Sequence, residues 1–325
     1  MPYYTPQAKS RQGNCVIITA MPVIVEAKNL TKKFGEFTAV NQISFSINEG
    51  ECFGFLGPNG AGKTTTVRMI HCVSPKTEGE LSVSGMPAQV DNRQIKKQIG
   101  VIPQEINLDT DLTVYENLFL TATFFDIDKN TAKQRIQDLL EFVELKQKIN
   151  KKIDELSTGM KRRLQIARAL INQPKLIIAD EPTTGLDPQA RHLIWQRLRE
   201  LKRQGVTLIL TTQYMEEAEQ LCDRVVVMYQ GKFIKEGTPE GLITEVIGNE
   251  VTEIQIGSDQ DERIIQHLGG VACGHERVGD ILYFYCRDGQ AIMKKVLELN
   301  LPKVLHRPAS LEDVFLKLTG RSLVE

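Results

Sequence analysis

The chain has 325 residues, of which 41% are hydrophobic and 25% are charged, and its formal net charge is −1. This length allows one large and one small domain, each with its own core. The balance of 40 Lys and Arg against 41 Asp and Glu argues against nucleic acid as a partner, because nucleic-acid-binding proteins concentrate basic residues on one face.

The six cysteines lie far apart and include no C-x-x-C pair. This spacing argues against a Cys-ligated metal site and against a disulfide framework. Free thiols in a reducing, cytoplasmic compartment are therefore expected. No apolar run approaches the roughly 18 residues that a membrane helix needs, so the chain is expected to reach a membrane only through a partner.

Residues 1–21 are expected to form a disordered extension, with Met21 as an alternative start. The apolar stretch Cys15–Val25 faintly resembles a signal peptide. Its last part, Val23–Ala27, instead predicts the first strand of the main domain.

Apolar, β-branched runs then alternate with amphipathic stretches, which is typical of a sheet with crossover helices. The predicted buried strands are Glu51–Leu56, Leu176–Ala179, Val206–Leu210 and Val225–Met228. Such near-continuous apolar runs suit parallel strands that are covered on both faces. A capping box from Thr113 to Glu116 starts one helix, and others are expected near residues 130–145, 160–172, 188–203 and 214–221. Trp195 lies at apolar spacing with Ile194 and Leu198, so we expect it in the core.

The pattern changes near Gly248, so the main domain is predicted over residues 22–247 and a small α/β domain over residues 248–325. The expected elements are strand Val251–Ile256, a helix near 260–268, strand Ile281–Cys286, helix Gln290–Leu299, a strand near Lys303–His306 and a final helix. Ser310 caps that last helix, with Glu312 and Asp313 in its first turn, where the dipole favours anions.

One segment of the main domain fits the phosphate-binding pattern G-x-x-x-x-G-K-[ST]. It consists of Gly57, Pro58, Asn59, Gly60, Ala61, Gly62, Lys63 and Thr64, and Thr65 opens the amphipathic helix that follows. The glycines let successive N–H groups converge on phosphate, and the helix N-terminus adds its positive end. Lys63 is predicted to neutralise the β- and γ-phosphates and Thr64 to bind Mg²⁺. This loop alone does not separate a kinase, a GTPase and a transport ATPase.

The strand Leu176–Ala179 ends in two acids, Asp180 and Glu181. Ligands bind at the carboxyl edge of a parallel sheet, so Asp180 is expected beside Mg²⁺. Glu181 is a candidate general base for an attacking water. The structural alternative is an acid pair that caps the following turn.

Together these motifs resemble the ABC ATPase family over about residues 22–245. Leu156–Met160 resembles the signature loop, although Thr158 and Met160 stand where the family usually has Gly and Gln. Gln104 resembles the Q-loop glutamine, and Thr184–Asp187 resembles the D-loop. The resemblance implies a P-loop NTPase with a RecA-like core, an antiparallel β subdomain and a helical signature subdomain, followed by the small C-terminal α/β domain.

The resemblance also implies that two chains bind ATP and Mg²⁺ between them, head to tail. Each site would join the phosphate loop of one copy to Ser157 and Gly159 of the other, with Asp187 also at the nucleotide. Gln104 would serve both Mg²⁺ and the reaction. Because one set of motifs is present, a homodimer is the simplest assembly. Phe34 resembles the aromatic residue that stacks on adenine; the alternative is a ring packed under a hairpin.

Gln213 occupies the position where the family has a switch histidine that contacts the γ-phosphate. An amide can donate to phosphate, but it cannot carry positive charge near neutral pH. We therefore expect reduced rather than abolished hydrolysis. The alternative is that this position has no effect on the rate.

Two further segments, Ala190–Trp195 and Ser310–Arg321, resemble the ATPases of drug and lipo-oligosaccharide exporters, including nodulation-factor and daunorubicin-resistance types. This implies a peripheral subunit on the cytoplasmic face of the cell (inner) membrane, whose ATP-driven closure moves a drug-like or lipid/oligosaccharide substrate. The substrate would pass through a separate membrane permease of about six helices. The alternatives are an ABC ATPase without a membrane partner and a weakly hydrolysing regulatory module.

Overall fold

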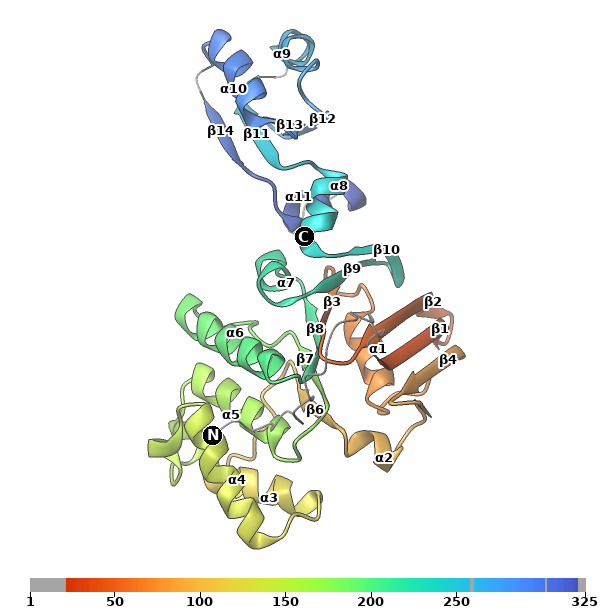
Figure 1. Cartoon of the computed structure of the whole chain (residues 1–325), viewed down its shortest axis with the longest axis vertical. Helices are drawn as coiled ribbons and strands as arrows, with labels where there is room; N and C mark the ends of the chain where they lie inside the picture. The colour runs from red at the N-terminus through yellow and green to blue at the C-terminus, as the bar shows by residue number, and fades with distance from the viewer. Residues whose placement is uncertain (1–21, 258–259, 302, 321–325) are drawn as a thin grey trace, which may run out of the picture. The chain divides into compact units, whose positions relative to one another are not determined.

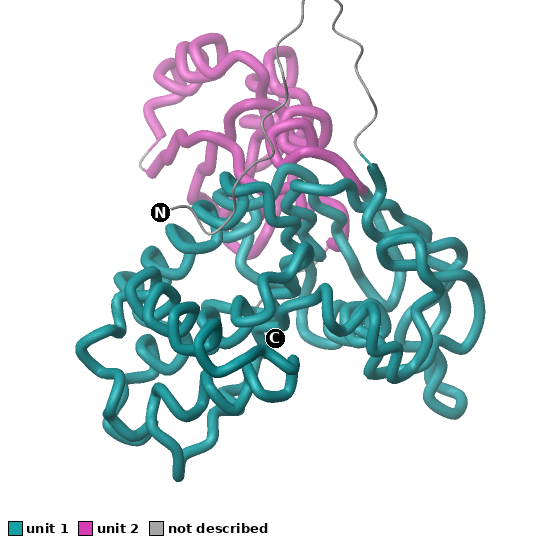
Figure 2. The backbone as a smooth tube through the Cα atoms, turned by 60° about the horizontal axis from the view of Figure 1, so that its bottom comes forward, with its two compact units in different colours: residues 1–235 teal, residues 236–325 magenta. Residues whose placement is uncertain are grey.

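The structure is a computed structural model that describes residues 22–257, 260–301 and 303–320 (Figure 1). The extension predicted over residues 1–21 lies outside this part. The chain divides into two compact units, Met1–Lys235 and Glu236–Glu325 (Figure 2). The division precedes the boundary predicted after residue 247, because helix α8 (Pro239–Val246) packs against α11 (Leu311–Thr319) within the second unit.

Within the described residues, the central sheet has the strand order β10-β9-β3-β8-β7-β6. Its strands are β3 (Cys52–Leu56), β6 (Ile99–Ile102), β7 (Leu176–Asp180), β8 (Thr207–Thr212), β9 (Arg224–Tyr229) and β10 (Lys232–Gly237). The pairs β3–β8, β3–β9, β6–β7 and β7–β8 are parallel. Every residue of β3, β7 and β8 is buried, as the apolar runs predicted.

A second sheet of the first unit is antiparallel, with the order β2-β1-β4-β5. Its strands are β1 (Val23–Phe34), β2 (Phe37–Asn48), β4 (Glu78–Val83) and β5 (Met86–Pro87). Of these, the apolar pattern identified only the start of β1. Register shifts along β1 and β2 interrupt the alternation of buried and exposed side chains, which obscures strands in a sequence.

The helices of the first unit are α1 (Lys63–Ile70), α2 (Arg93–Lys96), α3 (Val114–Phe124), α4 (Lys129–Phe142), α5 (Thr158–Leu170), α6 (Pro188–Arg203) and α7 (Met215–Leu221). The predicted capping box is confirmed, because Thr113 and Glu116 exchange hydrogen bonds at the start of α3. Trp195 on α6 is 1% exposed, which confirms its place in the core. Among the described residues, every helix is too short or too polar to cross a bilayer.

The second unit contains β11 (Glu250–Gln255), α9 (Asp261–Leu268), β12 (Gly274–Val278), β13 (Ile281–Cys286), α10 (Gly289–Glu298) and β14 (Val304–Pro308) before α11. Its antiparallel sheet has the order β12-β13-β11-β14. This β-α-β-β-α-β arrangement is ferredoxin-like. The predicted cap of α11 is confirmed by a capping box between Ser310 and Asp313. The sequence did not indicate β12, because most of its residues are not apolar and none of them is fully buried.

Candidate nucleotide site

The predicted site motifs meet at the carboxyl edge of the central sheet, because β3, β8 and β7 are neighbours. In register, Leu56 pairs with Thr212 and Asp180 pairs with Thr211. The phosphate loop therefore follows β3, the acid pair ends β7, and Gln213 directly follows β8. This is the edge at which parallel sheets bind ligands.

The phosphate loop has a backbone that requires glycine at two points. A Cβ on Gly57 would lie 2.2 Å from the carbonyl oxygen of Met228, and one on Gly62 would lie 2.5 Å from that of Ala39. Gly62 also has a φ of 103°, in the left-handed region. As the N-cap of α1, Gly62 contributes no capping side chain, so the first N–H groups of the helix are suited to an anion.

Lys63 and Glu181 form a buried ion pair in this site. The Nζ atom of Lys63 lies 3.2 Å from Oε1 of Glu181, and both side chains are 4% exposed. Lys63 also donates to the carbonyl oxygens of Gly57 at 2.8 Å and Pro58 at 3.0 Å. Burial lowers the pKa of Lys63, whereas the carboxylates of Glu181 and Asp180 act to raise it.

The other carboxylate oxygen of Glu181 accepts hydrogen bonds from two flanking loops. Gln104 donates its Nε2 at 3.0 Å and Thr184 donates its hydroxyl at 3.2 Å. The structure thus brings Lys63, Gln104 and Glu181 together, although Gln104 lies 77 positions from Glu181 in the chain. A carboxylate held by several donors has a defined orientation, as a general base requires.

Asp180 and Thr64 supply oxygen atoms beside this ion pair. The Thr64 hydroxyl donates to Oδ1 of Asp180 at 3.1 Å, and the hydroxyl of Thr211 donates to the same oxygen. No cluster of three or more His, Cys, Asp or Glu suited to a metal ion occurs in the part of the chain that the structure describes. One carboxylate with one hydroxyl fits Mg²⁺, which binds through few protein groups together with phosphates and water.

The remaining residues predicted around the nucleotide are accessible. The ring of Phe34 is 54% exposed, with Nζ of Lys32 4.8 Å from its centroid. The alternative of a ring packed under the hairpin therefore does not describe this residue. Gln213 is half-buried at the end of β8.

The signature and D-loop residues start two neighbouring helices. Ser157 caps α5 by accepting from Met160 N at 3.3 Å, and Asp187 caps α6 by accepting from Ala190 N at 2.9 Å. A Cβ on Gly159 would lie 3.1 Å from that of Ala190, so the two turns are close together. In the described segments, neither cap makes a hydrogen bond with the phosphate loop of its own chain.

The sequence reasoning missed how the loop after Gln104 is held. Arg162 on α5 is 3% exposed and donates to the carbonyl oxygens of Pro103 and Gln104, the latter at 2.7 Å. One helical turn further, Gln165 donates to the carbonyl oxygen of Glu105 at 2.8 Å. The sequence signal for these contacts was weak: α5 carries polar side chains, including Arg162 and Gln165, on a helix that also packs against the core.

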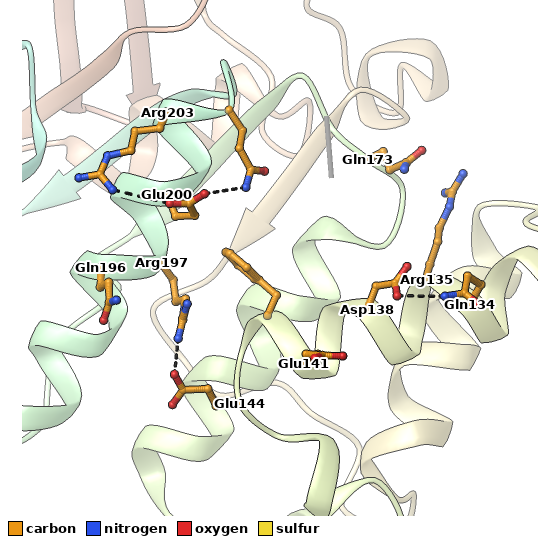
Figure 3. A pocket seen from close by; sticks show the side chains of 12 residues that line it. Gln134, Arg135, Asp138, Glu141, Glu144, Gln173, Gln196, Arg197, Glu200 and Arg203 are labelled. Carbon is orange, nitrogen blue, oxygen red and sulfur yellow. Dashed lines mark hydrogen bonds and ion pairs between the residues drawn. The ribbon is translucent and has the colours of Figure 1, made fainter. Parts of the chain in front are cut away.

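A cavity of about 900 Å³ lies beside α4 and α6 (Figure 3). Its walls carry side chains of both signs, including Arg197, whose guanidinium pairs with Glu144. None of the predicted nucleotide-site residues lines it. This cavity is therefore separate from the candidate site.

Comparison with known proteins gives two family matches. Residues 40–184 match the ABC transporter family, and residues 262–320 match the C-terminal domain of the nodulation factor export protein NodI.

Among solved structures, a dimer of the ATP-binding cassette MJ0796 bound to ADP and Pi is similar with a TM-score of 0.61 and 32% identity. It covers 66% of this chain and 98% of that one. The cbiO1 protein from Clostridium perfringens has a TM-score of 0.64 and 27% identity, with 69% and 92% covered.

Curated relatives match nearly the whole chain. The Nod factor export ATP-binding protein I of Burkholderia lata is 45% identical over 304 residues, which cover 93% of this chain and 99% of the relative. The protein of the same name from Rhizobium etli is 45% identical, with 92% and 94% covered. These matches span both units. The chain therefore belongs to the ABC transporter ATP-binding family, among the relatives of the Nod factor export ATP-binding proteins.

Proposed function

We propose that this ABC ATPase drives export of a lipo-oligosaccharide or a similar amphiphile through a separate membrane permease. The substrate class is supported by the names of relatives that are 45% identical over 93% of the chain. It is further supported by the match of residues 262–320 to a nodulation factor export domain. The alternative of a general drug exporter is not supported by this domain match.

The observation that carries the reaction is the buried contact of Lys63 with Glu181. Glu181 would accept a proton from a water molecule whose oxygen attacks the γ-phosphorus, while the bond to the β–γ bridging oxygen breaks to give ADP and phosphate. Lys63 would neutralise phosphate charge, and Gln104 would orient Glu181 through its 3.0 Å hydrogen bond. Gln213 would donate its amide to the γ-phosphate. Thr64 and Asp180 would hold Mg²⁺, which supplies positive charge to the phosphates.

A homodimer would complete each site. Ser157 is exposed at the N-terminus of α5, and such an end with its hydroxyl suits the γ-phosphate held by another copy. Gly159 and Asp187 would lie at the same interface. The exposed ring of Phe34 would stack on adenine.

The permease, of about six helices, would dock on a groove of about 380 Å³ that is lined in part by β6, α3 and α5. Its lining includes Val101, Phe125 and Ala169, together with the basic residues Lys96 and Arg168. Arg168 donates to the carbonyl oxygen of Asn107 at 2.7 Å. A permease segment bound in this groove would therefore contact a side chain that holds the loop after Gln104, and Gln104 in turn is hydrogen-bonded to Glu181. This arrangement would put the chain on the cytoplasmic face of the cell membrane.

The test is phosphate release by the purified chain, alone and in vesicles that contain a candidate permease. Lys63→Ala should abolish ATP binding and turnover, because it removes the cation for the phosphates. Phosphate release by the wild-type chain in the presence of the permease, together with co-purification of the two proteins, would support an exporter. Turnover without any association would favour an ABC ATPase that has no membrane partner. Nucleotide binding without phosphate release would instead favour a regulatory module.

A further inference from the structure

Glu217 is a buried carboxylate outside the set of residues to which a role was assigned above. It lies on α7 and is 0% exposed. One of its oxygens, Oε1, accepts hydrogen bonds from the hydroxyl of Thr183 at 2.8 Å and from Nε1 of Trp195 at 2.9 Å. Burial raises the pKa of Glu217. Burial of a carboxylate costs free energy unless hydrogen bonds compensate it, so this residue invites a functional explanation.

The two donors come from segments that carry predicted site residues. Thr183 is buried in the loop between Glu181 and Asp187, and Trp195 lies on α6, which Asp187 caps. Glu217 itself lies four positions after Gln213, in the first turn of the helix that starts at Met215. A single side chain thus joins the loops after β7 and β8 at their base.

Charged neighbours surround the same point. Arg191 on α6 and Arg162 on α5 both interact electrostatically with Glu217. The guanidinium carbon of Arg191 also lies 5.0 Å from the ring centroid of Tyr214, the residue after Gln213. These contacts connect α6 to the segment that carries Gln213 by a second route.

We propose that Glu217 is a positioning residue that fixes the loop of Glu181 against the segment of Gln213. This inference rests on the proposed function. With the connection intact, the residue that contacts the γ-phosphate and the residue that activates water keep a constant separation. Without it, Glu181 moves relative to the attacking water, and small displacements of this kind lower rates by as much as about 10²-fold. The phosphate loop is held by other contacts, such as the hydrogen bonds from Lys63 to the carbonyl oxygens of Gly57 and Pro58. ATP affinity is therefore preserved.

The test compares Glu217→Ala and Glu217→Gln with Glu216→Ala, which alters an exposed neighbour. Steady-state phosphate release across ATP concentrations should show that kcat of Glu217→Ala falls about 10- to 100-fold. Its KM should stay within about threefold of the wild type. Glu217→Gln retains an acceptor for Thr183 and Trp195, so it should recover a large part of kcat, and Glu216→Ala should equal the wild type.

The chain contains one tryptophan, so emission from Trp195 reports directly on its hydrogen bond to residue 217. A folded Glu217→Ala with altered emission and unchanged kcat would overturn the inference. If that variant does not fold, Thr183→Val removes one donor with little change of shape, and an unchanged kcat there would be equally decisive. An inactive wild-type protein would contradict the proposed function, which makes the two failures distinguishable.

Discussion

The ammonium of Lys63 lies 3.2 Å from the carboxylate of Glu181, so the proposed phosphate ligand is paired with the proposed general base. A γ-phosphate at Lys63 would share this one cation with a second negative group. Because both side chains are buried, the interaction is screened less than it would be in water. Nucleotide affinity and water activation are therefore linked through one contact.

Replacing Glu181 with Gln should separate these two effects. The substitution removes the competing charge, so ATP should bind several-fold more tightly, whereas loss of the general base should lower turnover by about 10²- to 10⁴-fold. Equilibrium binding of a fluorescent ATP analogue and phosphate release measure the two quantities. Weaker binding, or turnover at the wild-type rate, would contradict this assignment of Glu181.

Gln213→His should raise turnover. An imidazolium donates a charge-assisted hydrogen bond to phosphate, which is stronger than one from a neutral amide. We expect an increase of about three- to tenfold, which corresponds to at most about 1.4 kcal/mol in the barrier. Gln213→Ala should instead fall below the wild type. Equal rates for all three proteins would show that this position does not limit hydrolysis.

Phe34→Ala should weaken ATP binding by about 1–3 kcal/mol, the range for a base stacked on an aromatic ring. Phe34→Tyr should bind like the wild type. Phe124→Ala is the matched control, because this ring is 74% exposed at the end of α3 and has no predicted role in nucleotide binding. Isothermal titration would measure all three, and equal losses for Phe34→Ala and Phe124→Ala would exclude stacking at Phe34.

The second unit should lose stability in acid through Asp313. Burial acts to raise the pKa of Asp313, but hydrogen bonds from Arg307 and Ser310 outweigh it and hold the pKa below its ordinary value. A depressed carboxyl pKa stabilises the fold above its ordinary range, and this contribution disappears as the pH falls through the folded-state value. The free energy of unfolding should therefore decline below about pH 4.

Asp313→Asn should remove this decline and lower stability at pH 7 by about 2 kcal/mol, because it removes the charge-assisted hydrogen bonds to Arg307 and leaves Glu253 as the charged partner of that residue. Glu312→Gln is the control, because Glu312 is exposed and directly precedes Asp313 in the chain. Hydrogen exchange along β13 would report on the second unit, while Trp195 emission would report on the first. An unchanged acid slope in Asp313→Asn would show that another group controls the transition.

The sequence alone was sufficient for features whose chemistry is local. The phosphate loop, with its glycines and Lys63, the capping box at Thr113 and the cap at Ser310 depend on residues within a few positions of one another. Backbone freedom and side-chain caps act over that range. Four buried strands of the central sheet, β3, β7, β8 and β9, were equally clear, because a strand that is covered on both faces is apolar throughout. The short strand β6 was not predicted.

Tertiary structure decided which of these local features meet. Parallel pairing of β7 with β8 puts Asp180 beside Thr211, and the fold brings Glu181 within reach of Lys63 and Gln104. The connection from Glu217 to Thr183 spans 34 positions, and that from Arg162 to the Gln104 carbonyl spans 58. Contacts across such separations arise from chain topology, and a single sequence contains no periodic signal for them. The same holds for α8, whose place in the second unit is set by the helix α11, which follows much later in the chain.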